Sequence, residues 1–160
     1  MYDFTVRPKS MLFICTGNTC RSPMAECLAR EIFPDIAISS AGLAGFSGML
    51  ASEGAIAAMA ARGFSLEAHR SRAVTSYLLE EAELIIPMTS SHKRAVLAHF
   101  PEFATKVFTL GELAADETEN DNTALAEIND PYGLPTEVYL DTANNIEKLL
   151  FALAAKLPVK

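Results

Sequence analysis

The sequence MLFICTGNTCRSPMAECL, residues 11–28, gives the clearest indication of how this chain folds. It begins with a wholly apolar run, Met11 to Ile14, which is typical of a strand buried on both faces. Gly17 and Asn18 mark a tight loop after this run. The pair Ser22-Pro23 then predicts the start of a helix, in which Ser22 is the N-cap and Pro23 the first helical residue. A strand, a tight loop and a helix in this order are the opening unit of an α/β domain.

The same alternation continues along the chain. Further strands are expected at 36–39, 84–86 and 107–110, and further helices at 50–62, 76–83, 89–100 and 136–157. The polar segment Asp116 to Ala124 is expected to be a loop. Strands that alternate with helices predict a single α/β domain with a four-stranded parallel sheet and helices on both faces. We expect residues 1–10 to form a short N-terminal extension and residues 11–160 to form this domain.

Composition excludes several classes of protein. With 160 residues, 50% of them hydrophobic, the chain is too apolar to be disordered throughout. Its longest unbroken hydrophobic run, Ala55 to Ala61, is far shorter than the roughly 20 residues of a membrane span. The net charge of −7 argues against nucleic-acid binding, which needs a basic face. Three cysteines within the first 27 residues form a poor disulfide framework, so we expect a reducing, cytoplasmic compartment. We also expect a monomer without membrane or nucleic-acid partners.

The negative charge is concentrated in one part of the chain. Residues 107–147 contain ten acidic residues and no Lys or Arg, so this segment carries −10 and the remainder +3. A solvated acidic surface is the simpler interpretation of this segment. The alternative is an acidic rim that favours basic substrates.

The loop after the first strand carries the residues that indicate chemistry. Backbone N–H groups of a strand-to-helix loop can surround an anion, and the helix N-terminus adds positive potential. Gly17 permits the backbone angles of such a loop, and Arg21 offers a planar fork for two phosphate oxygens. Cys15 points at the centre, where these groups favour a thiolate over a thiol. An anionic sulfur beneath a bound phosphate is a nucleophile.

Cys15 to Pro23 matches the motif C-x-G-N-x-C-R-S-P, and in this respect the chain resembles the low-molecular-weight protein tyrosine phosphatases. Asp130-Pro131-Tyr132 matches a second motif of that family, and the resemblance extends from Met11 to about Leu153. It implies a phosphoprotein phosphatase that works through a phosphocysteine, without metal or cofactor. The implied catalytic residues are Cys15 as nucleophile, Arg21 as phosphate ligand and Asp130 as general acid. The implied phosphate-binding residues are Thr16, Gly17, Asn18, Thr19, Cys20 and Arg21. Asn18, Ser22 and His69 are expected to support this loop, although His69 could equally be a surface turn residue.

Within the family, the chain is similar to the bacterial protein arginine phosphatases. Thr19 stands where tyrosine-specific members usually carry a larger aliphatic residue, and Gly133 follows Tyr132 where many of them have a second aromatic. Met88-Thr89 with His92-Lys93 also resembles that branch. We therefore expect phosphoarginine as the substrate, selected by Thr19 and Tyr132, with phosphotyrosine as the alternative.

Other interpretations of these residues are weaker. Arsenate reductases of similar fold relay electrons through cysteines far downstream, and this chain has no Cys after Cys27. A non-catalytic phosphate-binding module would be expected to lose Cys15 or Asp130. Cys20 is either a reversible disulfide partner of Cys15 or a small buried filler. We expect Cys27 to be structural, and His92 and His99 to be ordinary solvated or capping residues.

Overall fold

The computed structural model describes residues 1–116 and 122–160 of the chain. In this part of the chain, three parallel strands form one sheet in the order β2-β1-β3, with β1 (Ser10–Cys15) between β2 (Ala37–Gly42) and β3 (Leu84–Pro87). Phe13 pairs with Ser40 on one side and with Ile86 on the other. Cys15, the last residue of β1, pairs with Gly42, so it lies at the carboxyl edge of the sheet.

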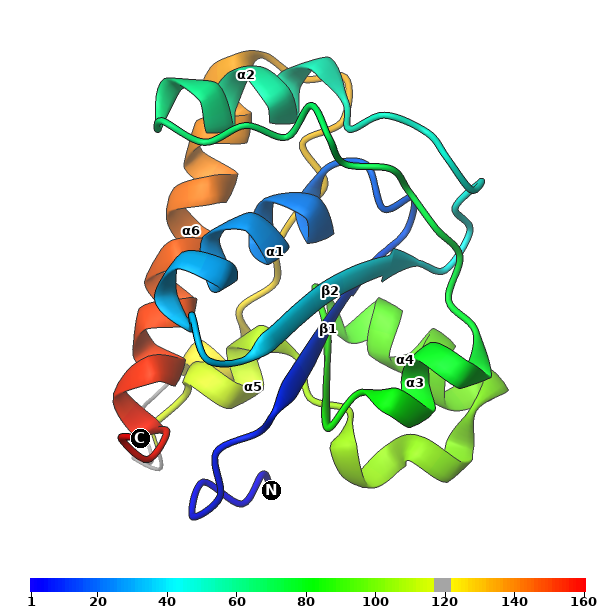
Figure 1. Ribbon diagram of the computed structural model, residues 1–160, viewed down its shortest axis with the longest axis vertical. Helices are drawn as coiled ribbons and strands as arrows, with labels where there is room; N and C mark the ends of the chain where they lie inside the picture. Colours follow the sequence, from blue (N-terminus) through cyan, green and yellow to red (C-terminus); the bar gives the residue numbers. More distant parts are fainter. Residues whose placement is uncertain (117–121) are drawn as a thin grey trace.

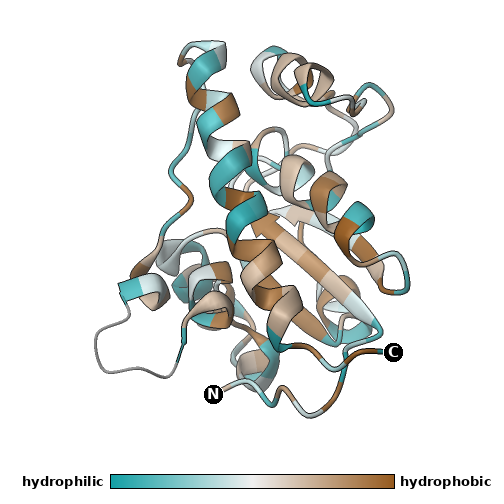
Figure 2. Ribbon diagram, turned by 90° about the vertical axis from the view of Figure 1, so that its left-hand side faces the viewer, coloured by the Kyte–Doolittle hydropathy of each residue, from teal (hydrophilic) through white to brown (hydrophobic). Residues whose placement is uncertain are grey.

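Helices cover both faces of this sheet (Figure 1). Met11 and Phe13 of β1 pack into a core shared with α1 (Arg21–Ile32), α2 (Glu53–Ala61), α5 (Leu110–Ala114) and α6 (Thr136–Lys156). Leu12 and Ile14 face the opposite layer, which contains α3 (Ser76–Glu81) and α4 (Ser90–His99). Most of the sheet is hydrophobic, although β1 begins with Ser10 and β2 contains Ser39 and Ser40, whereas α6 mixes hydrophobic and hydrophilic residues along its length (Figure 2). The wholly apolar run in β1 therefore has the predicted cause, which is burial on both faces.

The prediction of a fourth strand at 107–110 is wrong. A short 3-10 helix, η1 (Pro101–Lys106), leads into Val107, which forms only a single parallel bridge with Ile85. Thr109 then starts α5 with a capping box: its Oγ1 accepts from the backbone N of Glu112 (3.1 Å), whose carboxylate accepts from the Thr109 N–H (2.8 Å). Because this capping box turns the chain into a helix, the extended segment ends after the bridge.

The predicted start of the first helix is also wrong. Helix α1 begins at Arg21 with Cys20 as its N-cap, so Ser22 and Pro23 are its second and third residues. The physical reason is that the Ser22 hydroxyl lies against Cys15 and Asn18 instead of capping the helix. Helix α2 begins later than the predicted residue 50, because Ser52 caps it by accepting from the Ala55 N–H.

Other boundaries are close to those expected. Thr75 and Thr89 cap α3 and α4, and α6 covers almost all of the predicted 136–157. Of the predicted loop at 116–124, residues 117–121 lie outside the described part of the chain, and a short 3-10 helix, η2 (Asn122–Leu125), follows them. Within residues 1–116 and 122–160, no helix is long and apolar enough to cross a membrane, and no three His, Cys, Asp or Glu side chains gather as a metal site.

Candidate active site

A cavity of about 210 Å³ opens at the carboxyl end of β1. It is lined by eight residues that the sequence had singled out: Cys15, Thr16, Gly17, Thr19, Cys20, Arg21, Asp130 and Tyr132. Asp130 is more than one hundred residues from Cys15 in the sequence, and the fold brings the two to the same cavity. Asn18, Ser22 and His69 do not line this cavity and instead contact the loop or its sulfur from behind.

Cys15 is buried, and its sulfur has a directed polar partner. The Ser22 hydroxyl oxygen lies 2.9 Å from Cys15 Sγ, and the Asn18 Nδ2 group donates to the same oxygen at 2.9 Å. Because the Ser22 oxygen accepts from Asn18, the hydroxyl proton of Ser22 is free to point at the sulfur. This arrangement stabilises a negative charge on Cys15.

Asn18 holds the loop in an uncommon conformation. Its φ of +56° lies in the left-handed region, which asparagine tolerates better than most residues. The Nδ2 group also donates to Ser40 Oγ (2.9 Å), and Oδ1 accepts from the Arg72 backbone N–H (3.0 Å). His69 Nε2 lies 2.7 Å from the Asn18 carbonyl oxygen, so His69 contacts the loop. Ser40 in β2 and the segment 69–72 thus both hold one loop residue.

Gly42, at the end of β2, packs tightly against the backbone of the loop. A Cβ atom at Gly42 would lie 2.8 Å from the Thr16 carbonyl oxygen and 2.9 Å from the Asn18 backbone N. A side chain fits into this space only if the backbone of the loop shifts. Gly42 is therefore required for the loop to pack against the edge of the sheet.

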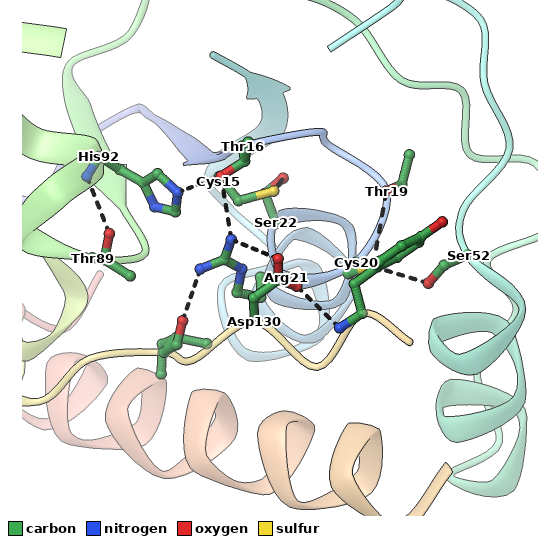
Figure 3. Close-up of polar contacts among 12 residues, drawn as sticks. Cys15, Thr16, Thr19, Cys20, Arg21, Ser22, Ser52, Thr89, His92 and Asp130 are labelled. Carbon is green, nitrogen blue, oxygen red and sulfur yellow. Dashed lines mark hydrogen bonds and ion pairs between the residues drawn. The ribbon is translucent and has the colours of Figure 1, made fainter. Parts of the chain in front are cut away.

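Arg21 and Asp130 place opposite charges at the cavity (Figure 3). Arg21 is only 5% exposed, and its Nη1 donates to the Ile128 carbonyl oxygen at 3.1 Å. Its Nη2 lies 3.6 Å from Asp130 Oδ2, and the Asp130 side chain is half exposed. Asp130 Oδ1 in turn accepts from the Tyr132 backbone N–H at 3.1 Å. The Arg21 Nε group is buried and has no hydrogen-bond partner among the described residues, so it is a donor that an oxyanion in the cavity could use.

The two other cysteines have different surroundings. Cys20 Sγ donates to Ser52 Oγ at 3.0 Å and lies 3.7 Å from the Tyr139 hydroxyl, whose pKa is raised by burial. Cys27, in α1, is half-buried against the core, and burial raises the pKa of its thiol. All three cysteines of the chain are free thiols.

His92 is the residue that the sequence interpretation missed. It is 7% exposed, and its Nε2 lies 2.9 Å from Thr16 Oγ1, so the expectation of a solvated residue is wrong. Burial, followed by the nearby Arg21 charge, lowers its pKa to about 4. Thr89 was the available signal, because a cap at Thr89 makes His92 the third residue of a helix that starts at the carboxyl edge of the sheet. His99, by contrast, is exposed.

Comparison with known proteins agrees with this geometry. The family model described as "Low molecular weight phosphotyrosine protein phosphatase" matches residues 10–160. A protein-arginine-phosphatase of Geobacillus stearothermophilus is 38% identical over 94% of this chain and 97% of its own length. A probable low molecular weight protein-tyrosine-phosphatase, EpsP of Ralstonia solanacearum, is 34% identical over 88% and 90%.

Solved structures extend this likeness to the fold. A mutant of YwlE arginine phosphatase, with a phosphorylated serine in place of the active-site cysteine, superimposes with a TM-score of 0.83. It is 33% identical, and the match covers 91% of this chain and 93% of that one. The chain is therefore a cysteine-dependent protein phosphatase that belongs to the low molecular weight phosphotyrosine protein phosphatase family.

Proposed function

We propose that Cys15, Arg21 and Asp130 carry out the hydrolysis in two steps. In the first step the Cys15 thiolate attacks phosphorus, the S–P bond forms, and the bond from phosphorus to the leaving group breaks as Asp130 gives that group a proton. In the second step Asp130 takes a proton from water, which attacks phosphorus and releases phosphate and the thiolate. Arg21 and the amides of the loop stabilise the charge on the phosphoryl oxygens in both steps.

The supporting observation for these roles is their common cavity. The buried sulfur, the buried guanidinium and the half-exposed carboxylate line the same 210 Å³ space. The Ser22 hydroxyl stabilises the thiolate as the attacking group and later as the leaving group. The phosphorylated serine in the YwlE mutant stands where that enzyme's nucleophile would carry the phosphoryl group.

We propose phosphoarginine in proteins as the preferred substrate, and the position of Thr19 carries this proposal. Thr19 is half-buried in the wall of the cavity that also contains Asp130. An aliphatic side chain there would pack against a phenyl ring, whereas a threonine offers a hydroxyl beside a polar guanidinium. The Asp130 carboxyl group can also hydrogen-bond a guanidinium nitrogen of the substrate, and in its protonated form it donates the proton to the leaving nitrogen. Similarity to the protein-arginine-phosphatase of G. stearothermophilus supports the same choice.

A protein substrate has a surface on which to lie beside the cavity. A second hollow, of about 880 Å³, shares Thr19 and Tyr132 with the catalytic cavity. Its lining includes Met49, Leu50 and Leu134, each about half exposed. These apolar side chains can contact the residues that flank the phosphorylated one.

The test compares kcat/KM for matched phosphoarginine and phosphotyrosine peptides, with Cys15→Ser as the blank. We expect a clear preference for phosphoarginine, which Thr19→Ile should shift toward phosphotyrosine by roughly tenfold, the range of one hydrophobic pocket contact. Thr19→Ser is the matched control, because it retains the hydroxyl and should retain the preference. A preference of the wild-type protein for phosphotyrosine would reject the choice of substrate. Absence of turnover with both peptides would reject the mechanism.

We further propose that the protein works as a cytoplasmic monomer on phosphoprotein substrates, without nucleic-acid or membrane partners. A thiol nucleophile requires a reducing environment, and the net charge of −7 repels both nucleic acid and anionic lipid surfaces. Cys20 remains our candidate partner for a protective disulfide with Cys15. Its alternative role as buried filler is consistent with its contacts to Ser52 and Tyr139.

A further inference from the structure

The Thr16 hydroxyl links two helices that lie on opposite faces of the sheet. Its Oγ1 accepts from Arg21 Nη2 at 3.4 Å and lies 2.9 Å from His92 Nε2. Arg21 belongs to α1 and His92 to α4, which pack against different faces of β1. The His92 ring points toward Thr16 at the edge of the site (Figure 3). These three residues therefore form a continuous polar chain across the carboxyl edge of the sheet.

His92 occupies this place at a cost in stability. Its Nδ1 is buried and has no hydrogen-bond partner among residues 1–116 and 122–160. An unpaired buried polar group is unfavourable, and an apolar side chain of similar size would avoid the penalty. Neither step of the proposed hydrolysis uses His92. A local cost of this kind next to an active site is typical of a residue that contributes to that site.

The surroundings of His92 keep it neutral. Its pKa of about 4 reflects burial first and then repulsion by the Arg21 guanidinium. The carboxylates of Glu127 and Asp130 oppose this effect only in part. At neutral pH the ring therefore carries one proton, and one of its two nitrogens is an acceptor.

We propose that His92 is a positioning residue for the phosphatase reaction, acting on Arg21 through Thr16. The Thr16 hydroxyl has one proton to give, and His92 Nε2 is in place to accept it. The lone pairs of the hydroxyl then face Arg21 Nη2 and hold the guanidinium in the orientation that a phosphoryl group needs. His92 touches no reacting atom. The inference rests on the role proposed above for Arg21 and does not depend on which phosphorylated residue is the substrate.

The first test is a double-mutant cycle on kcat and KM with an aryl phosphate at pH 7. His92→Phe keeps the ring volume and removes the hydrogen bond, and Thr16→Val removes the hydroxyl with little change of shape. We expect each variant to lower kcat/KM by about tenfold, as for one hydrogen bond, and the double variant to lower it by about the same factor rather than a hundredfold. His92→Gln, which retains an amide acceptor, should recover most of the loss. Additive losses, or wild-type kinetics in His92→Phe, would overturn the proposal.

The second test needs no variant and so does not depend on folding of the mutants. Long-range ¹H–¹⁵N NMR of the wild-type protein identifies which ring nitrogen of His92 carries the proton. The proposal requires the proton on Nδ1 and an unprotonated Nε2, and a proton on Nε2 would contradict it.

A separate variant, Arg21→Ala, distinguishes failure of this inference from failure of the proposed function. Full activity in Arg21→Ala would reject the role of Arg21 itself.

Discussion

Asn18 offers the most direct test of how the loop is held. Asn18→Gly removes the side-chain amide, and with it three hydrogen bonds: two donated to Ser22 and Ser40, and one accepted from the Arg72 backbone. Each such bond contributes about 1 kcal/mol net, and Ser22 and Ser40 are too buried for water to replace Asn18. We therefore expect Asn18→Gly to lower the free energy of unfolding by about 3 kcal/mol.

Asn18→Ala adds a second, separable effect. Alanine at a φ of +56° costs about 1–2 kcal/mol, and glycine does not incur this cost. Glycine has more freedom in the unfolded chain, which offsets about 0.5–1 kcal/mol of its advantage. Asn18→Ala should therefore be less stable than Asn18→Gly by about 1 kcal/mol, although it has the larger side chain.

The assay is urea unfolding followed by circular dichroism, since the chain has no tryptophan to report by fluorescence. Ser40→Ala, which removes one of the three bonds, is the graded control and should cost about 1 kcal/mol. Both Asn18 variants should also lose kcat/KM, because the Ser22 hydroxyl is no longer directed at Cys15. An alanine variant as stable as the glycine variant would refute the backbone argument. A glycine variant within 1 kcal/mol of wild type would refute the contribution assigned to the hydrogen bonds.

Three further outcomes are expected elsewhere in the molecule. Gly42→Ala should destabilise by about 1–3 kcal/mol and lower kcat/KM, because its Cβ would press on the loop backbone; unchanged kinetics would count against that packing. Thr109→Ala should lower the free energy of unfolding by about 1 kcal/mol, because the capping box is lost, and should leave kcat/KM unchanged. Urea unfolding and steady-state kinetics can check both expectations. The free energy of unfolding should fall by up to about 3 kcal/mol between pH 6.5 and pH 4, because the unfolded chain protonates His92 below 6.5 and the folded chain only below its pKa of about 4. His92→Gln should remove that part of the slope, and an identical slope in both proteins would show that another group is responsible.

The residues around the loop were predictable because they are local in sequence. A buried strand, a glycine-containing turn and a helix start fix where Cys15 and Arg21 lie with little help from the rest of the chain. The exact helix start was not predictable in this way. Ser22 is a good cap by composition, but the contact with Cys15 draws its hydroxyl elsewhere.

Two other differences between the sequence prediction and the structure have different physical origins. Residues 107–110, three of which are apolar, fit a strand as well as the approach to a helix. The signal that favours the helix, Thr109 followed three residues later by Glu112, was present in the sequence. His92 could not be recognised from its neighbours alone. Its burial depends on contact with Thr16, 76 residues away, which only the assembled sheet provides.

The scattered origin of the contacts around Cys15 has a consequence for the newly synthesised chain. Ser40, His69 and Arg72 hold Asn18, and the carbonyl of Ile128 holds Arg21, so these partners emerge from the ribosome well after the cysteine itself. Until they have been made and packed, the contacts proposed to activate Cys15 are incomplete. The nucleophile proposed above is therefore assembled only in the finished domain, after most of the chain has been synthesised.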